Sequence, residues 1–150
     1  MLKTNLGVVI LCATMIVPTA SILRAEEPQE APTGPIPSQI LTAQKVFISN
    51  GGGDPNTAAG IYNELYAQMK VWGHYQLVGS PGEADLVLEI GPSRLIIEDP
   101  TVTLKLRDPK SGILLWTIDE AFRKPNDKGF NDAVDRLVND LKVLTAPAAK

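Results

Sequence analysis

A strand, a glycine loop and a helix follow one another in residues 45–73, KVFISNGGGDPNTAAGIYNELYAQMKVWG. Lys45 to Ser49 is apolar at its centre and runs into Asn50 and three glycines, which predicts a first, central strand. Asp54 followed by Pro55 predicts a helix start, because aspartate accepts hydrogen bonds from free amides and proline suits the first helical position. This order predicts a helix that packs on a sheet.

The helix has one apolar face. Its apolar residues recur at spacings of three and four, and Gly73 marks its end. Tyr62 and Tyr66, four residues apart, are expected to line the margin of this face. The residues of the face are Ala58, Ile61, Leu65, Met69 and Trp72.

Two further strands are expected before the middle of the chain. Tyr75 to Val78 predicts the second strand, and Ser80 to Glu83 has the capping-box pattern of a single helical turn. Asp85 to Ile90 predicts the third strand, with a possible continuation at Leu95 to Ile97. Pro92 indicates an edge or a bend there, because proline cannot donate to a strand ladder.

A hairpin is the clearest element of the sequence. Val102 to Arg107 alternates apolar and polar residues, which predicts one buried and one wet face. Residues 108–112 form the turn, and Ile113 to Ile118 returns. The return arm is apolar on both faces and is expected to lie inside the sheet.

A last helix carries a second apolar stripe. The stripe consists of Phe130, Val134, Leu137, Leu141 and Leu144, and the polar residues expected to face water are Asp132, Asp135, Asp140 and Lys142. The resulting order is β-α-β-β-β-β-α, with the first and second strands parallel through their helical crossover. The expected fold class is α+β: a two-layer sandwich with a mixed four- to five-stranded sheet and two helices on one face.

The first residues have the layout of a secretory signal peptide. Lys3 precedes an apolar run from Leu6 to Val17, and a small-residue region ends at Ala25. We therefore predict a signal peptide over 1–25, with cleavage after Ala20 as an alternative site. The expected location is secreted or periplasmic; the alternative is an uncleaved anchor in the inner membrane.

Cleavage would change the chemistry of the chain. It removes Cys12, the single cysteine, and the cations Lys3 and Arg24, so the formal charge moves from -3 to -5. The apolar residues before Cys12 do not fit a lipoprotein signal. A thiol-free, acidic chain predicts no disulfide, no thiol nucleophile, no nucleic-acid binding and no stable membrane insertion after cleavage.

The remaining chain is expected to form a single domain. Residues 26–37, EEPQEAPTGPIP, hold four prolines and three glutamates and predict a disordered linker. The α+β domain is placed at 38–146, and residues 147–150 are expected to be a disordered tail.

The glycine loop is one candidate site. Gly51, Gly52, Gly53 and Asp54 lie between a strand and a helix, where backbone amides can hold a phosphate or another anion. No Gly-Lys-Ser/Thr follows, and Asp54 places a negative charge at the docking position. The alternatives are a flexible turn and a loop that binds a small anionic ligand.

Catalytic and metal chemistry are not indicated. His74 is the single histidine, and Ser49, Ser80 and Ser93 lack a nucleophile-elbow context. The adjacent acids Glu98-Asp99 and Asp119-Glu120 would point to opposite faces of a strand, and no calcium-loop pattern occurs. We expect no enzyme activity, no metal and no cofactor.

The return arm of the hairpin is the second candidate site. Because one layer of helices covers one face of a sheet, a strand that is apolar on both faces can leave an exposed apolar surface. Leu114, Trp116 and Ile118 are the residues predicted to form a protein interface there.

Three stretches carry a resemblance. They are residues 45–50 with the glycine loop, residues 75–90, and residues 131–142, NDAVDRLVNDLK. Together they resemble small uncharacterised secreted proteins of acidobacteria, over about Ile36 to Ala146. More distantly, the element order is similar to the amino-terminal domain of the periplasmic protein TolB. The resemblance implies an envelope accessory role and transfers no functional residue.

The sequence thus predicts an exported, non-enzymatic accessory domain of the cell envelope that binds another envelope protein. The contact would use the apolar return strand or an open sheet edge. The alternative is a small anionic-ligand binder that uses the loop from Gly51 to Gly53.

Overall fold

The computed structural model describes residues 34–93, 101–122 and 126–146. The predicted signal peptide, most of the linker, the possible strand continuation at 95–97 and the tail at 147–150 lie outside these ranges. Among the helices in the described ranges, none combines the length and the hydropathy needed to cross a bilayer.

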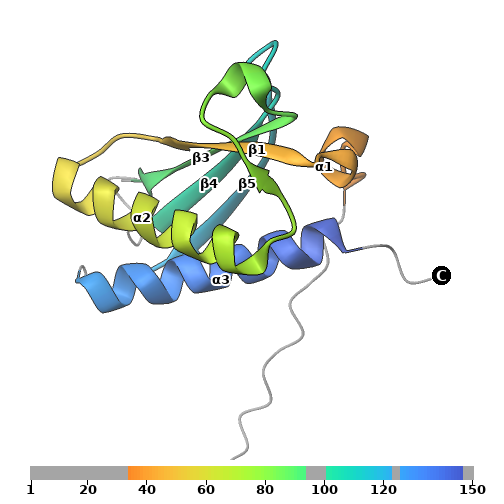
Figure 1. Cartoon of the computed structure of the whole chain (residues 1–150). Helices are drawn as coiled ribbons and strands as arrows, with labels where there is room; N and C mark the ends of the chain where they lie inside the picture. Colours follow the sequence, from red (N-terminus) through yellow and green to blue (C-terminus); the bar gives the residue numbers. More distant parts are fainter. Residues whose placement is uncertain (1–33, 94–100, 123–125, 147–150) are drawn as a thin grey trace, which may run out of the picture.

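The domain is a mixed five-stranded sheet with two long helices on one face, as predicted. Figure 1 shows α2 and α3 side by side along that face. The sheet order is β2-β1-β3-β4-β5. The elements are α1 (Ser38–Thr42), β1 (Lys45–Asn50), α2 (Pro55–Trp72), β2 (Gln76–Leu77), the 3₁₀ turn η1 (Pro81–Glu83), β3 (Leu86–Ser93), β4 (Thr101–Arg107), β5 (Leu114–Ala121) and α3 (Asp127–Thr145).

Helix α2 begins and ends where the sequence predicts. The Asp54 carboxylate accepts a 3.0 Å hydrogen bond from the amide of Thr57, and Pro55 occupies the first turn. Gly73 ends the helix in the left-handed conformation, at φ 65°. The residues that α2 buries are Ala58, Ile61, Leu65 and Met69.

Helix α3 buries most of its predicted stripe. Asn126 caps it by accepting a 2.9 Å hydrogen bond from the amide of Gly129. Phe130 is half-buried against Phe122, with ring centroids 4.7 Å apart. Asp140, which we expected to face water, is half-buried instead. The fully packed residues of α3 are Ala133, Val134, Leu137, Val138, Leu141 and Leu144.

Parallel and antiparallel pairing meet at β3. Strand β1 runs parallel to both β2 and β3, whereas β3, β4 and β5 form an antiparallel meander. Strand β3 is the third of five strands in the sheet order. The edge position, one of the two alternatives predicted from Pro92, is therefore wrong. The pairing of β3 with β1 ends at Ile90, and Pro92 therefore costs no ladder hydrogen bond on that side.

The prediction that the return arm lies inside the sheet is wrong, because β5 is an edge strand. A register shift opposite Leu106 and Arg107 interrupts its alternation. As a result, the neighbours Leu115 and Trp116 both pack against the core, and Ile118 is buried on the same side. The bulge, not burial on two faces, accounts for the nearly continuous apolar run.

Two smaller features differ from expectation. The five-residue helix α1 was not predicted, although its Ile40 is buried in the core. The turn at η1 forms as predicted, but the Ser80 side chain makes no capping hydrogen bond. Instead, the amide of Glu83 donates to the backbone carbonyl of Ser80 at 3.3 Å.

Candidate functional site

The predicted interface residues share strand β5 but do not share a surface. Leu114 is 47% exposed at the start of the strand. Trp116 is half-buried against the core, and Ile118 is 9% exposed on the side that faces α2 and α3. The apolar surface left at β5 is therefore smaller than predicted and divided, because Leu114 pairs with Arg107 on the sheet face away from the two long helices and Trp116 pairs with Leu106 of the core.

The outer edge of β5 is the longest unpaired edge of the sheet. Strand β5 has eight residues and pairs with β4 alone, and within the described part of the chain no strand lies on its other side. Backbone amide and carbonyl groups on an edge strand are available to pair with another chain. The opposite edge is formed by β2, which has two residues.

A charged cluster joins the end of β5 to α3. The guanidinium of Arg136 donates to the Glu120 carboxylate at 2.6 Å and to the carbonyl of Ala121 at 2.7 Å. Partial burial, and after it the neighbouring Glu120 carboxylate, raise the pKa of Asp140 to about 6, although Arg136 acts in the opposite direction. The i, i+4 spacing of Arg136 and Asp140 was visible in the sequence, but the approach of Glu120 was not.

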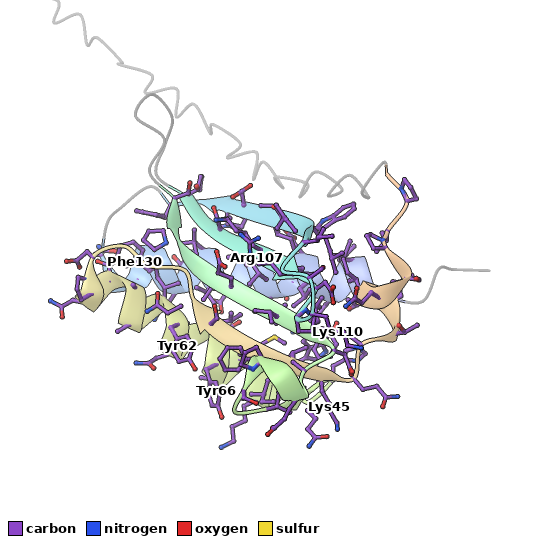
Figure 2. All side chains as sticks on the ribbon, turned by 90° about the horizontal axis from the view of Figure 1, so that it is seen from above. Lys45, Tyr62, Tyr66, Arg107, Lys110 and Phe130 are labelled. Atoms are coloured by element: carbon purple, nitrogen blue, oxygen red, sulfur yellow. The ribbon has the colours of Figure 1, made fainter. Side chains whose placement is uncertain are left out.

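The sheet face away from the two long helices, here called the open face, is polar. Arg107 lies on it in Figure 2, where its guanidinium donates to the Glu89 carboxylate at 3.0 Å. Lys105 makes a longer 3.5 Å contact with the same carboxylate. Thr103 and Asp119 are joined by a hydrogen bond on the neighbouring strands. The open face thus carries charge pairs where an apolar docking surface was considered.

Hydrogen bonds inside the glycine loop already use part of its anion-binding capacity. The Gly51 amide donates to the Ile90 carbonyl at 2.7 Å, and the Gly52 amide donates to the Asn50 side chain at 2.9 Å. The Asp54 carboxylate accepts from both the amide and the hydroxyl of Thr57, each at 3.0 Å. The helix terminus therefore already has an anion beside it, which does not favour the alternative of an anionic ligand.

The glycines have structural reasons to be there. A Cβ on Gly51 would lie 3.1 Å from the carbonyl oxygen of Ile90, and one on Gly91 would lie 3.2 Å from the backbone of Gly51. The two backbones thus pack directly on each other. Gly53 has φ 112°, and a Cβ there would lie 2.6 Å from the Pro92 ring.

The residues considered for catalysis are not brought together. His74 is exposed and stacks on Trp72 at a centroid distance of 4.8 Å. Ser49 and Ser93 lie on strands, and among the described hydrogen bonds none links a serine to His74. Asp119 and Glu120 point to opposite faces of β5, where they accept hydrogen bonds from Thr103 and Arg136 respectively, as expected for adjacent strand residues. Glu98 and Asp99 lie outside the described residues.

A polar hollow of about 570 Å³ lies at the end of the sheet beside α1. The Gln39 amide bridges it, donating at 2.9 Å to both the Asp85 carbonyl and the Asp108 carboxylate. Hydrogen bonds from the Lys45 and Gln44 amides lower the pKa of Asp85, and hydrogen bonds led by that of Ser111 lower the pKa of Asp108. These hydrogen bonds use the polar groups that line the hollow, and they form a brace between α1 and the hairpin turn.

A second hollow, of about 480 Å³, lies between α2 and the edge of β1. Two tyrosines of α2, Tyr62 and Tyr66, stack at a centroid distance of 6.3 Å along its wall. The sequence placed these tyrosines at the margin of the helix, but it gave no sign of the hollow. The other lining residues are Phe47, Ile48, Asn63, Leu77, Val78 and Gly79.

Metal binding finds no support from geometry in the described ranges. There, no three His, Cys, Asp or Glu side chains approach one another closely enough to hold an ion.

Comparisons with known proteins assign neither a family nor a function. No family model and no curated protein matches the chain. Two crystal structures of the PelC dodecamer from Paraburkholderia phytofirmans are similar to this chain at 14% sequence identity. The first has a TM-score of 0.47 and covers 65% of this chain and 87% of the PelC chain. The second has a TM-score of 0.43 and covers 72% of this chain and 91% of the PelC chain. Uncharacterised lipoprotein B from Nitrosomonas europaea has a TM-score of 0.39 at 14% identity, over 65% of this chain and 81% of that one. Scores below 0.5 are too low to transfer function, and the resemblance to secreted acidobacterial proteins stays a prediction.

Proposed function

We propose that this chain is an exported, non-enzymatic accessory domain of the cell envelope, and that it binds another envelope protein along the outer edge of β5. The observation that carries the proposal is the unpaired eight-residue edge of this strand in the described structure. An extended segment of a partner would pair with β5 and add a sixth strand to the sheet.

The side chains along β5 support a contact at its first half. Leu114 is 47% exposed and Trp116 is half-buried, so both have apolar surface left to cover. The second half is less suited, because Asp119 is exposed and Glu120 is tied to Arg136. Charges on an edge strand discourage pairing, and we therefore place the partner mainly against Leu114 to Thr117.

Affinity capture from envelope extract tests this surface. The tagged protein is compared with Leu114→Asp and Trp116→Asp, which place a charge on the proposed contact. Val71→Asp is the matched control, because Val71 is 89% exposed on α2, the helix that packs under β1 and β3. We expect both β5 variants to recover about tenfold less of the specific partner, or still less, and the control to recover as much as the natural protein. Equal recovery by all four proteins would refute the proposal.

Two further measurements complete this test. Circular dichroism of Trp116→Asp shows whether a loss of binding reflects unfolding of a half-buried site. Hydrogen exchange on the recovered complex should show added protection in β5 amides, because strand addition hydrogen-bonds them.

For the export part of the proposal, intact mass measurement of the mature protein should give an amino terminus just after Ala25. A mature chain that still begins at Met1 would contradict cleavage.

A further inference from the structure

The hollow beside β1 lies where the sheet is incomplete. Strand β2 pairs with β1 only at Lys45 and Val46. On the other side of β1, pairing with β3 continues through Asn50. From Ile48 to Asn50, β1 is therefore paired on one side, and within the described residues no strand lies on the other.

The walls of the hollow belong to this unpaired segment and its neighbours. Ile48 itself lines it, and the chain leaving β2, from Leu77 to Gly79, closes one end. Tyr62 and Tyr66 form the wall on the helix side, and Figure 2 shows them beyond the border of β1 that faces away from β3. Tyr66 is 42% exposed, so it has aromatic surface left to contact a ligand.

Backbone and side chains offer two kinds of interaction at one place. A strand laid beside Ile48 to Asn50 would hydrogen-bond to β1 and continue the row that β2 begins. Successive side chains of that strand would point alternately toward the tyrosines and toward the open face, where Phe47 lines the same hollow. A small ring-shaped ligand would use the tyrosines but leave the edge of β1 unpaired.

Charge restricts the ligand further. None of the eight residues that line the hollow is charged. A charged side chain placed among Phe47, Tyr62 and Leu77 would lose water without gaining a partner. The matching segment is therefore uncharged where it enters the hollow.

We propose that the β1 edge from Ile48 to Asn50 and the tyrosine-lined hollow together bind an extended, uncharged peptide segment of another protein, with one apolar or aromatic side chain seated against Tyr62 and Tyr66. This site is separate from the β5 contact and lies at the opposite side of the sheet. The domain thus has a peptide site at each side of one sheet.

The test uses capped peptides and the purified, ¹⁵N-labelled protein. The probe is the hexapeptide acetyl-Thr-Val-Thr-Phe-Thr-Ser-amide. Two N-methylated versions, each blocking one set of alternate backbone amides, report on strand addition. We expect the parent probe to shift the amide resonances of Ile48 and Asn50 with a Kd of about 1 mM. One N-methylated version should bind like the parent and the other should not, because a strand added to an edge uses every second amide.

Variants of the protein locate the aromatic contact. Tyr66→Ala should weaken binding about fivefold, whereas Val71→Ala, an equally simple truncation on the same helix, should leave it unchanged. Replacing phenylalanine in the probe by lysine should abolish binding. Leu114→Asp should not change binding of the probe, because Leu114 belongs to the separate β5 contact. A failure of the β5 proposal would therefore leave the peptide-binding result at β1 unchanged.

Several outcomes would overturn the inference. They are no shift at Ile48 and Asn50 at peptide concentrations around 5 mM, equal binding by both N-methylated peptides, and equal binding by Tyr66→Ala. A titration with methyl glucoside is a further check: if the glucoside binds the hollow and the peptides do not, the site recognises a sugar ring and the peptide proposal is wrong.

Discussion

Gly53 and Gly60 have opposite structural requirements. Gly53 has φ 112°, and a Cβ there would lie 2.6 Å from Pro92, whereas Gly60 lies inside α2 with nothing within 4 Å. We expect Gly53→Ala to lower the free energy of unfolding by about 1–3 kcal/mol. Gly60→Ala should raise it by about 0.5–1 kcal/mol, because alanine is the better helix former. Urea denaturation measures both, and a fully stable Gly53→Ala would contradict the strained geometry.

Asp140 makes stability depend on pH. Its native pKa of about 6 lies above the 3.8 that is usual for an aspartate, with Glu120 of β5 and Arg136 of α3 as the charged groups that face it. The native state therefore holds the proton more tightly than the unfolded chain, so this contribution is fully present below about pH 4 and is lost as the pH rises through 6. Asp140→Asn removes the titration but keeps an amide that can donate to Glu120.

We therefore expect Asp140→Asn to gain stability relative to the natural protein as the pH rises. The gain at pH 7.5 should be about 1 kcal/mol after allowance for the partial exposure of the site. Denaturation of both proteins at about pH 4.5 and pH 7.5 measures it. A stability difference that stays constant between these two pH values would rule out the raised pKa.

At the scale of elements, α1 depends on distant residues. Gln39 donates to Asp85 and Asp108, which lie 46 and 69 positions further along the chain. Gln39→Ala should lower the free energy of unfolding by about 1 kcal/mol, because two acceptors lose their donor. Hydrogen exchange in α1 should become faster as well. Gln76→Ala, at an exposed glutamine of β2, is the control and should change neither property; a similar effect in both variants would show that the brace is unimportant.

The elements that the sequence predicted correctly are those with local signals. Asp54, Pro55 and Gly73 mark the ends of α2, and the apolar stripe of α3 is periodic. Helix α1 has five residues and no periodicity, and its stabilising contacts come from far along the chain, so a local pattern could not reveal it. The edge position of β5 was also missed, because strand order is set by long-range pairing and the bulge disguised a one-sided strand.

The candidate sites also divide into features with a local sequence signal and features that depend on long-range contacts. Three glycines in a row were recognisable, but their cause, the close packing of Gly51 against Gly91, joins residues on separate strands. The four-residue spacing of Tyr62 and Tyr66 predicted that they lie together on α2. The hollow beside them could not be predicted, because it depends on how soon β2 leaves β1. A site formed by the incompleteness of a sheet leaves no local pattern in the sequence.

At the scale of the whole molecule, the core in the described ranges is shared among elements from the beginning, the middle and the end of the domain. Strand β1 needs β3 from later in the chain, and α3, the last element, packs against α2, β4 and β5. Half of the sheet would therefore be left without its second layer if α3 were displaced. Such an arrangement predicts a single cooperative unfolding transition.

Two substitutions on α3 test this dependence. Leu137 is fully buried, so Leu137→Ala should lower the free energy of unfolding by about 2–4 kcal/mol. Val143 is 53% exposed on the same helix, and Val143→Ala should change it by less than about 0.5 kcal/mol. Trp72 lies at the end of α2 and Trp116 on β5, so tryptophan fluorescence reports on side-chain packing at a helix end and at the edge strand, while circular dichroism reports on the helices. Because α3 completes a core shared by all of them, the two signals should change together in urea for both variants, at a lower midpoint for Leu137→Ala. Separate transitions would mean that side-chain packing around the two tryptophans is lost independently of the helices, and would contradict a single cooperative core.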